Sequence, residues 1–168
     1  MTRTRTAIGL RAFCIFIAAF IAGCAAPKSA KEGFGDSKYW QGRIAIQVLS
    51  SPRQTFTSDF ELQGQSEVGN LTLLSPLGTT VAHMHWAPGA AQLRQGGEVR
   101  NFESLSALAL QAIGTDLPLS ALFDWLNGVL TPAPGWDVDL SRLPEGRLQA
   151  RRAADSSPAV ELKIILVP

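Results

Sequence analysis

Cysteine is scarce in this sequence of 168 residues, and both cysteines, Cys14 and Cys24, lie within its first 24 residues. The chain after them can form no disulfide and no zinc site built on thiolates. It must therefore fold by burying apolar side chains. With 46% hydrophobic and 17% charged residues, its composition is that of an ordinary globular domain, and its length favours one domain rather than two.

An excess of positive charge is also absent once the N-terminal segment is set aside. Three of the fifteen basic residues are Arg3, Arg5 and Arg11, so residues 24–168 carry twelve basic against fourteen acidic side chains. Binding to a phosphate backbone needs a concentration of Lys and Arg. Nucleic acid is therefore not expected among the partners.

Catalytic and metal-binding motifs are equally sparse. Gly35-Asp36-Ser37 resembles the start of a GDS-type esterase, but no histidine follows His85 and no Gly-x-Ser-x-Gly elbow occurs. His83 and His85 alternate with Met84 and Trp86, which places the two imidazoles on the polar side of a strand rather than in a metal site. We expect neither an enzyme nor a metalloprotein.

The N-terminus is organised like a bacterial signal peptide. A basic segment at residues 1–11 precedes an apolar run at residues 12–22, which is too short to span a membrane comfortably. The run ends in Ile21-Ala22-Gly23-Cys24, which resembles the lipobox of bacterial lipoproteins, with small residues before the cysteine. The alternative is a simple membrane anchor in which the cysteine is incidental.

Cys24 is thus the predicted lipidation site, carrying an S-diacylglycerol and an N-acyl chain, and no other cofactor is expected. Several acyl chains give stable attachment, because each buried methylene contributes about 0.8 kcal/mol. Ala25 follows where an Asp would resemble an inner-membrane retention signal, so we expect anchoring at the periplasmic face of the outer membrane. The predicted organisation is a signal peptide (1–23), a lipidated Cys with a flexible tether (24–38) and a folded domain (39–168).

Alternation of apolar residues predicts strands throughout the folded domain. In Arg43–Val48, for example, Ile44, Ile46 and Val48 share one face. Further strands are predicted at residues 55–62, 69–74, 79–86, 91–93, 98–101, 136–140, 147–151 and 160–167. Arg43 is expected to be a strand-end charge or a tie between sheet and helix, and Arg151-Arg152 a solvated loop.

Two helices interrupt these strands. Apolar residues recur at helical spacing between Phe102 and Ala112, with Asn101 as a possible N-cap and Gly114 as the stop. A second helix is predicted from Pro118 to Asn127. The fold class is therefore α+β, a curved antiparallel sheet covered by two or three helices.

Several segments together resemble the LolB family of outer-membrane lipoprotein receptors, over about Trp40 to Trp136. They are Trp40-Gln41-Gly42-Arg43-Ile44, Leu73-Leu74-Ser75-Pro76-Leu77-Gly78-Thr79, and Leu117-Pro118 followed by Leu122, Trp125, Leu126 and Gly128. The resemblance implies a half-open β-barrel, closed by helices, with an apolar cavity. It also implies a monomeric receptor that takes lipoproteins from the periplasmic carrier LolA and places them in the outer-membrane phospholipid.

Acyl chains of the cargo would occupy the cavity, and its candidate lining is apolar. The candidates are Ile44, Ile46, Phe56, Phe60, Leu73, Met84, Leu122, Trp125 and Leu126. Each is also an ordinary core residue. The alternative function is that of a structural or assembly-accessory outer-membrane lipoprotein, whose apolar surface contacts proteins rather than acyl chains.

Pro76, Leu77 and Gly78 form the predicted membrane-insertion loop. Ser75-Pro76-Leu77-Gly78 fits a type I turn with Leu77 at its third position, where a large apolar side chain is unusual. By the resemblance, Leu77 corresponds to the residue that protrudes and helps to deliver lipoproteins. The alternative is a leucine folded back onto the core.

Overall fold

The computed structural model describes residues 38–153 and 158–167. The predicted signal peptide, the lipidation site Cys24 and the tether as far as residue 37 lie outside the described residues. The described residues belong to one compact unit, and a form of the protein that begins at Ala25 retains all of them. None of the helices in the described part is both long and apolar enough to cross a membrane.

Nine strands form one antiparallel sheet in the order β6-β5-β4-β3-β2-β1-β9-β8-β7. The strands are β1 Tyr39–Val48, β2 Gln54–Gly64, β3 Gly69–Leu74, β4 Thr80–Ala87, β5 Ala90–Gln95, β6 Glu98–Phe102, β7 Trp136–Asp139, β8 Arg147–Arg152 and β9 Val160–Leu166. Every predicted strand is present within a few residues of its expected bounds. The sheet is open, because β6 and β7 form its two edges.

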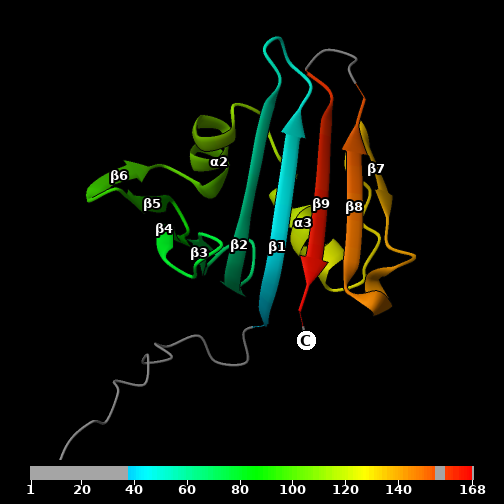
Figure 1. Cartoon of the computed structure of the whole chain (residues 1–168), viewed down its shortest axis with the longest axis horizontal. Coiled ribbons are helices and arrows are strands. Elements are labelled where there is room, and N and C mark those ends of the chain that lie inside the picture. The colour runs from blue at the N-terminus through cyan, green and yellow to red at the C-terminus, as the bar shows by residue number, and fades with distance from the viewer. Residues whose placement is uncertain (1–37, 154–157, 168) are drawn as a thin grey trace, which may run out of the picture. The chain divides into compact units, whose positions relative to one another are not determined.

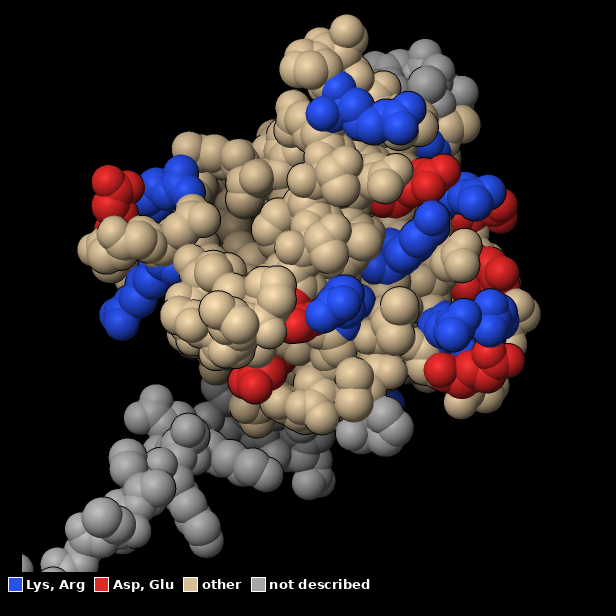
Figure 2. All heavy atoms as spheres, viewed as in Figure 1, with Lys and Arg blue, Asp and Glu red and all other residues tan. Residues whose placement is uncertain are grey.

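The alternating residues assemble one continuous apolar face across the central strands. In the register of β1 and β9, Ile46 lies opposite Leu162, and Val48 lies opposite Val160. All four side chains are buried. The helices pack over this inner face: α3 lies behind β1 and β9 in Figure 1, and α2 lies beside β2. On the other face, charged side chains of both signs gather over β1, β9 and β8 (Figure 2).

The helices are short and capped by different means. In α2 (Leu105–Ile113), Ser104 Oγ accepts a hydrogen bond from the Ala107 N–H, and Gly114 ends the helix in the left-handed conformation at φ 77°. The predicted cap, Asn101, is wrong because β6 extends through that residue, which pairs with Gln92. The second helix, α3, runs from Leu119 to Leu126, and a short 3₁₀ turn, η1, covers Leu143–Glu145.

Arg152 ties the helical layer to the sheet. It lies in β8 opposite the buried Val160, so its side chain is on the inner face. Its guanidinium donates to the carbonyl oxygens of Asp116 (3.0 Å) and Pro158 (3.2 Å) and to Thr115 Oγ1 (2.5 Å), and it stacks on Trp136 at 5.6 Å. Thr115 and Asp116 belong to the link between α2 and α3. The expectation of a solvated loop at Arg151-Arg152 is therefore wrong.

Replacing Arg152 by alanine should destabilise the domain by about 1–3 kcal/mol, because the buried Thr115 hydroxyl and two carbonyl groups lose their donor. Urea unfolding of the form that begins at Ala25 measures this loss. Arg151→Ala is the matched control, since Arg151 is the neighbouring arginine of β8 and is exposed on the outer face. It should change stability by less than about 0.5 kcal/mol. Equal losses in the two variants would contradict the role of Arg152.

Candidate functional site: an apolar pocket and an exposed turn

A pocket of about 330 Å³ lies between the inner face of the sheet and the two helices. Twenty-two of its twenty-five lining residues are apolar. They come from strands β1 to β5, strand β9, both helices and the link between the helices. Its size is near the lower end of the range for small-molecule pockets, about 300–1,000 Å³. Such a lining favours an apolar ligand, because it offers few hydrogen-bonding groups.

Eight of the nine predicted lining residues contribute to this pocket. They are Ile44, Ile46, Phe56, Phe60, Leu73, Met84, Leu122 and Leu126. The ninth, Trp125, lies outside the lining and is completely buried. Its indole Nε1 donates to the Thr131 carbonyl oxygen at 2.8 Å, and its ring packs against Trp136 with the ring centres 6.2 Å apart. Trp125 therefore holds α3 against the loop that leads to β7.

Sequence reasoning missed much of the rest of the wall. Several missed residues continue the alternation of strands whose other members were predicted, so the same pattern could have identified them. They are Leu62, Leu71, Ala82 and Trp86. Leu93 of β5 and Ile164 of β9 also line the pocket, although no residue of these two strands was among the candidates. The contribution of α2 was also missed: Leu105, Leu108, Ala109, Ala112 and Ile113 line the pocket together with Gln111.

The turn between β3 and β4 lies outside the pocket and is held by a dense set of hydrogen bonds. The Gly78 N–H donates to the Ser75 carbonyl oxygen at 2.8 Å, as the predicted turn requires, and the Ser75 N–H donates to Thr79 O at 2.8 Å. Ser75 Oγ accepts from the N–H groups of Leu77 (3.3 Å) and Thr79 (3.2 Å). Gly78 has φ 77°, a left-handed conformation that glycine adopts without strain.

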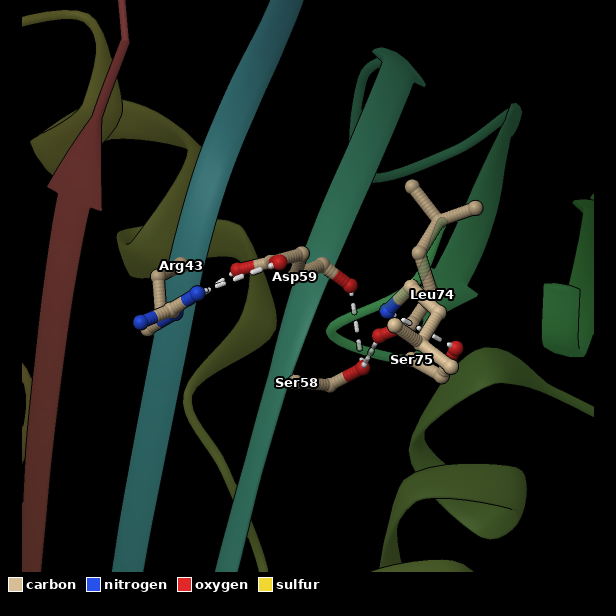
Figure 3. Close-up of polar contacts among 6 residues, drawn as sticks. Arg43, Ser58, Asp59, Leu74 and Ser75 are labelled. Atoms are coloured by element: carbon tan, nitrogen blue, oxygen red, sulfur yellow. Dashed lines mark hydrogen bonds and ion pairs between the residues drawn. The ribbon is translucent and has the colours of Figure 1, made fainter. Parts of the chain in front are cut away.

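This turn exposes the Leu77 side chain. The leucine is 93% exposed, the largest exposed fraction among the large hydrophobic residues described. The alternative that it folds back onto the core is wrong. The base of the turn is joined to β2, where the buried Ser58 places its Oγ 2.9 Å from the Leu74 carbonyl oxygen (Figure 3). A well-anchored turn therefore carries an apolar side chain that is almost wholly exposed.

Arg43 lies next to this region on the outer face of β1. It forms a bidentate pair with Asp59 of β2, at 2.7 and 3.2 Å (Figure 3). The hydrogen bonds from Arg43 hold the pKa of the Asp59 carboxyl below its usual value. Arg43 is thus a cross-strand partner, and the proposed tie between sheet and helix is made by Arg152 instead.

The two histidines of β4 alternate with Ala82, Met84 and Trp86, which line the pocket, so they lie on the outer face. His85 Nδ1 is 2.8 Å from Asn70 Oδ1, and partial burial lowers the pKa of His83, with Arg94 adding to the effect. Across residues 38–153 and 158–167, no group of three or more His, Cys, Asp or Glu side chains is placed to hold a metal ion.

The fold and the site define a class of protein: an open, curved antiparallel sheet with two helices over its inner face and an apolar pocket between the layers. The model of the family "Outer membrane lipoprotein LolB" matches residues 38–157. The chain belongs to the LolB family. This confirms the resemblance drawn from the sequence, and the match extends beyond Trp136 through β7 and β8.

Individual relatives agree with the family match. The outer-membrane lipoprotein LolB of Bordetella pertussis is 36% identical over 72% of this chain and 63% of its own length. The LolB of Bordetella petrii is 33% identical over 67% of this chain and 58% of its own length. The LolB of Cupriavidus pinatubonensis is 33% identical over 88% of this chain and 72% of its own length. The chain thus matches about three fifths of the length of the two Bordetella proteins.

Filling the pocket should reduce its capacity for an apolar ligand. Ala82 is buried and lines the pocket, so Ala82→Phe places a ring in that space. We expect at least a tenfold loss of affinity for a fluorescent fatty-acid probe, with a stability cost of about 1–3 kcal/mol from overpacking. Binding is measured by titration of the form that begins at Ala25.

The matched control is His83→Phe, which places the same phenyl ring at the next residue of β4 but on the outer face, in place of an imidazole. It should leave the probe affinity within about twofold. Unchanged binding by a folded Ala82→Phe variant would show that the probe binds elsewhere.

Proposed function

We propose that this protein is a lipid-anchored receptor at the periplasmic face of the outer membrane. It accepts lipoproteins from the soluble carrier LolA, binds their acyl chains in the pocket and inserts them into the membrane. The observation that carries the proposal is an apolar pocket, with Ile46, Phe60 and Leu126 in its wall, in a chain of the LolB family. Its role is binding and transfer rather than catalysis.

Transfer of this kind needs no nucleotide. A ligand moves towards the site that binds it with the lower free energy, so cargo passes from carrier to receptor if the receptor pocket is the better host. Each methylene buried in an apolar environment contributes about 0.8 kcal/mol. A difference of two buried methylenes between two pockets therefore changes the equilibrium by roughly tenfold.

Delivery is assigned to the β3–β4 turn. Inserting the Leu77 side chain into hydrocarbon contributes about 1.5–3 kcal/mol. This is too little to anchor a domain in a bilayer. It is sufficient to bias a domain that is already tethered through an acylated Cys24, because the tether keeps the turn close to the membrane surface.

The direct test uses the form that begins at Ala25, purified LolA loaded with a lipoprotein, and a pull-down that scores movement of the cargo. Acceptance of cargo by this form supports the receptor function. A well-folded form that binds neither cargo nor a fatty-acid probe would instead favour the alternative of an accessory lipoprotein, which contacts other proteins through its surface.

Replacing Cys24 tests the anchor separately. Cys24→Ala removes the thiol, so the precursor should take up no labelled lipid and the protein should be released from the membrane fraction. Acceptance of cargo should persist, because the pocket and Leu77 lie in the folded domain. Mass spectrometry of the mature N-terminus is the measurement, and an unmodified Cys24 in the natural protein would contradict lipidation.

Leu77→Glu tests delivery without affecting acceptance. The substitution places a charge where hydrocarbon is the proposed environment, and it meets repulsion from anionic lipid. We expect stability and acceptance of cargo from LolA to stay within twofold of the natural protein. Incorporation of cargo into liposomes should fall by about tenfold, as the loss of 1.4 kcal/mol or more implies.

Leu77→Phe is the matched variant, since it keeps an apolar side chain at the same exposed position. It should retain incorporation, because the turn needs apolar bulk rather than a particular shape. A two-step assay that scores acceptance and incorporation separately distinguishes the outcomes. If Leu77→Glu incorporates cargo as well as the natural protein does, the turn has no part in delivery.

A further inference from the structure

Three polar side chains interrupt the otherwise apolar wall of the pocket. They are Gln95 at the end of β5, Arg100 in β6 and Gln111 in α2. All three residues are exposed, so they mark the rim where the pocket meets solvent. Arg100 is the only charged residue in the lining. Figure 2 shows the surface hollowed between the β5–β6 hairpin and β2.

The pairing of β5 with β6 determines which way Arg100 faces. Arg100 lies opposite Leu93, a buried residue that itself lines the pocket, and directly opposed residues of antiparallel strands share a face. Gln95 lies two residues after Leu93 and is therefore on the same face. Arg94, between them, is on the opposite face, where its Nε donates to Gln92 Oε1 at 3.1 Å.

None of the three rim side chains forms a polar contact that links parts of the described fold. Among the described residues, Gln95, Arg100 and Gln111 make no side-chain hydrogen bond and no ion pair, although Glu98 lies opposite Gln95 in the hairpin. By contrast, the guanidinium groups of Arg43, Arg142 and Arg152 all bind protein acceptors. Arg100 therefore keeps its donors available to a group held at the mouth of the pocket.

We infer that this rim, and Arg100 above all, binds the oxygen-bearing head of an acyl ligand whose chain occupies the pocket. The inference rests on the proposed function and adds the group that is recognised. A guanidinium and two side-chain amides are hydrogen-bond donors that suit carbonyl and carboxylate oxygens. A carboxylate is the strongest acceptor, because its hydrogen bonds to arginine are charge-assisted.

The ester and amide carbonyls of a lipidated cysteine and the carboxylate of a free fatty acid share this chemistry. Three ligands with the same acyl chain distinguish these sources: a fatty acid, the corresponding fatty alcohol and a synthetic triacylated cysteine peptide. Each competes with an apolar fluorescent probe for the form that begins at Ala25. This form retains the compact unit to which the described residues belong.

Arg100→Gln should lower the affinity for the fatty acid about five- to tenfold and the affinity for the triacylated peptide about two- to fivefold. The affinity for the alcohol should stay within about twofold of that of the natural protein. If Arg100→Gln loses affinity for the peptide, the head of the lipidated cysteine is a ligand of the rim. If it loses affinity for the fatty acid alone, the ligand is a free carboxylate. Arg100→Lys, which keeps the charge but not the planar fork, should recover part of the fatty-acid affinity.

Arg94→Gln is the matched control, because it removes the same charge from the same hairpin on the opposite face. It should change all three affinities by less than twofold. An equal loss in Arg94→Gln and Arg100→Gln would overturn the inference in favour of a general effect of charge. A loss that is the same for fatty acid and alcohol would also overturn it, while the proposed function would stand. If the natural domain binds no acyl ligand, both fail.

Discussion

The pairing of β1 with β9 joins the two parts of the sheet, β6 to β1 on one side and β9 to β7 on the other. The paired residues, such as Val48 and Val160, are more than a hundred residues apart in the chain. Ile46 and Val48 of β1 and Val160, Leu162 and Ile164 of β9 are all buried on the inner face, so the pairing creates one wide apolar surface rather than two narrow ones. Two short helices cover that surface only in part. The pocket is the space that remains between an open sheet and this small helical layer.

Within one short segment, one leucine lines the pocket and another is exposed at the tip of the turn. Leu73 lines the pocket from β3, and the Leu74 carbonyl oxygen is fixed by Ser58 of β2. The register between β3 and β4 shifts at this point, as in a β-bulge, and such irregularities redirect the chain. Leu77 follows at the tip of the turn, where 93% of the residue is exposed to solvent. A rigid turn suits the proposed delivery, because an apolar residue on a mobile loop could fold back and bury itself.

The local pattern of the sequence predicted the structural features that depend on residues close together in the chain. Period-two alternation found the strands, and an unusual residue at a turn tip predicted that Leu77 is exposed. What was missed depends on contacts between distant residues. The role of Arg152 could not be predicted, because it depends on β8 lying beside the α2–α3 link. Trp125 was wrongly predicted to line the pocket, because helical periodicity does not show which apolar residue contacts the loop after α3. Similarly, the face of Arg100 follows only from the β5–β6 register.

The arginines show how one residue type is divided among different tasks in this fold. Arg152 binds the α2–α3 link, and so fixes the two helices at their junction without filling the space beneath them. Arg152 is half-buried at that junction, where its stacking on Trp136 and its three acceptors offset the cost of desolvating the guanidinium, although its Nε has no hydrogen-bond partner among the described residues. Arg100 makes no such contacts with the part of the chain that the structure describes, and it lies at the rim of the pocket. Under the proposed function the pocket both takes up and releases a ligand, and this division suits that role. A helical layer secured at its junction keeps the apolar wall in place, while polar groups without a partner among residues 38–153 and 158–167 are available to the proposed ligand.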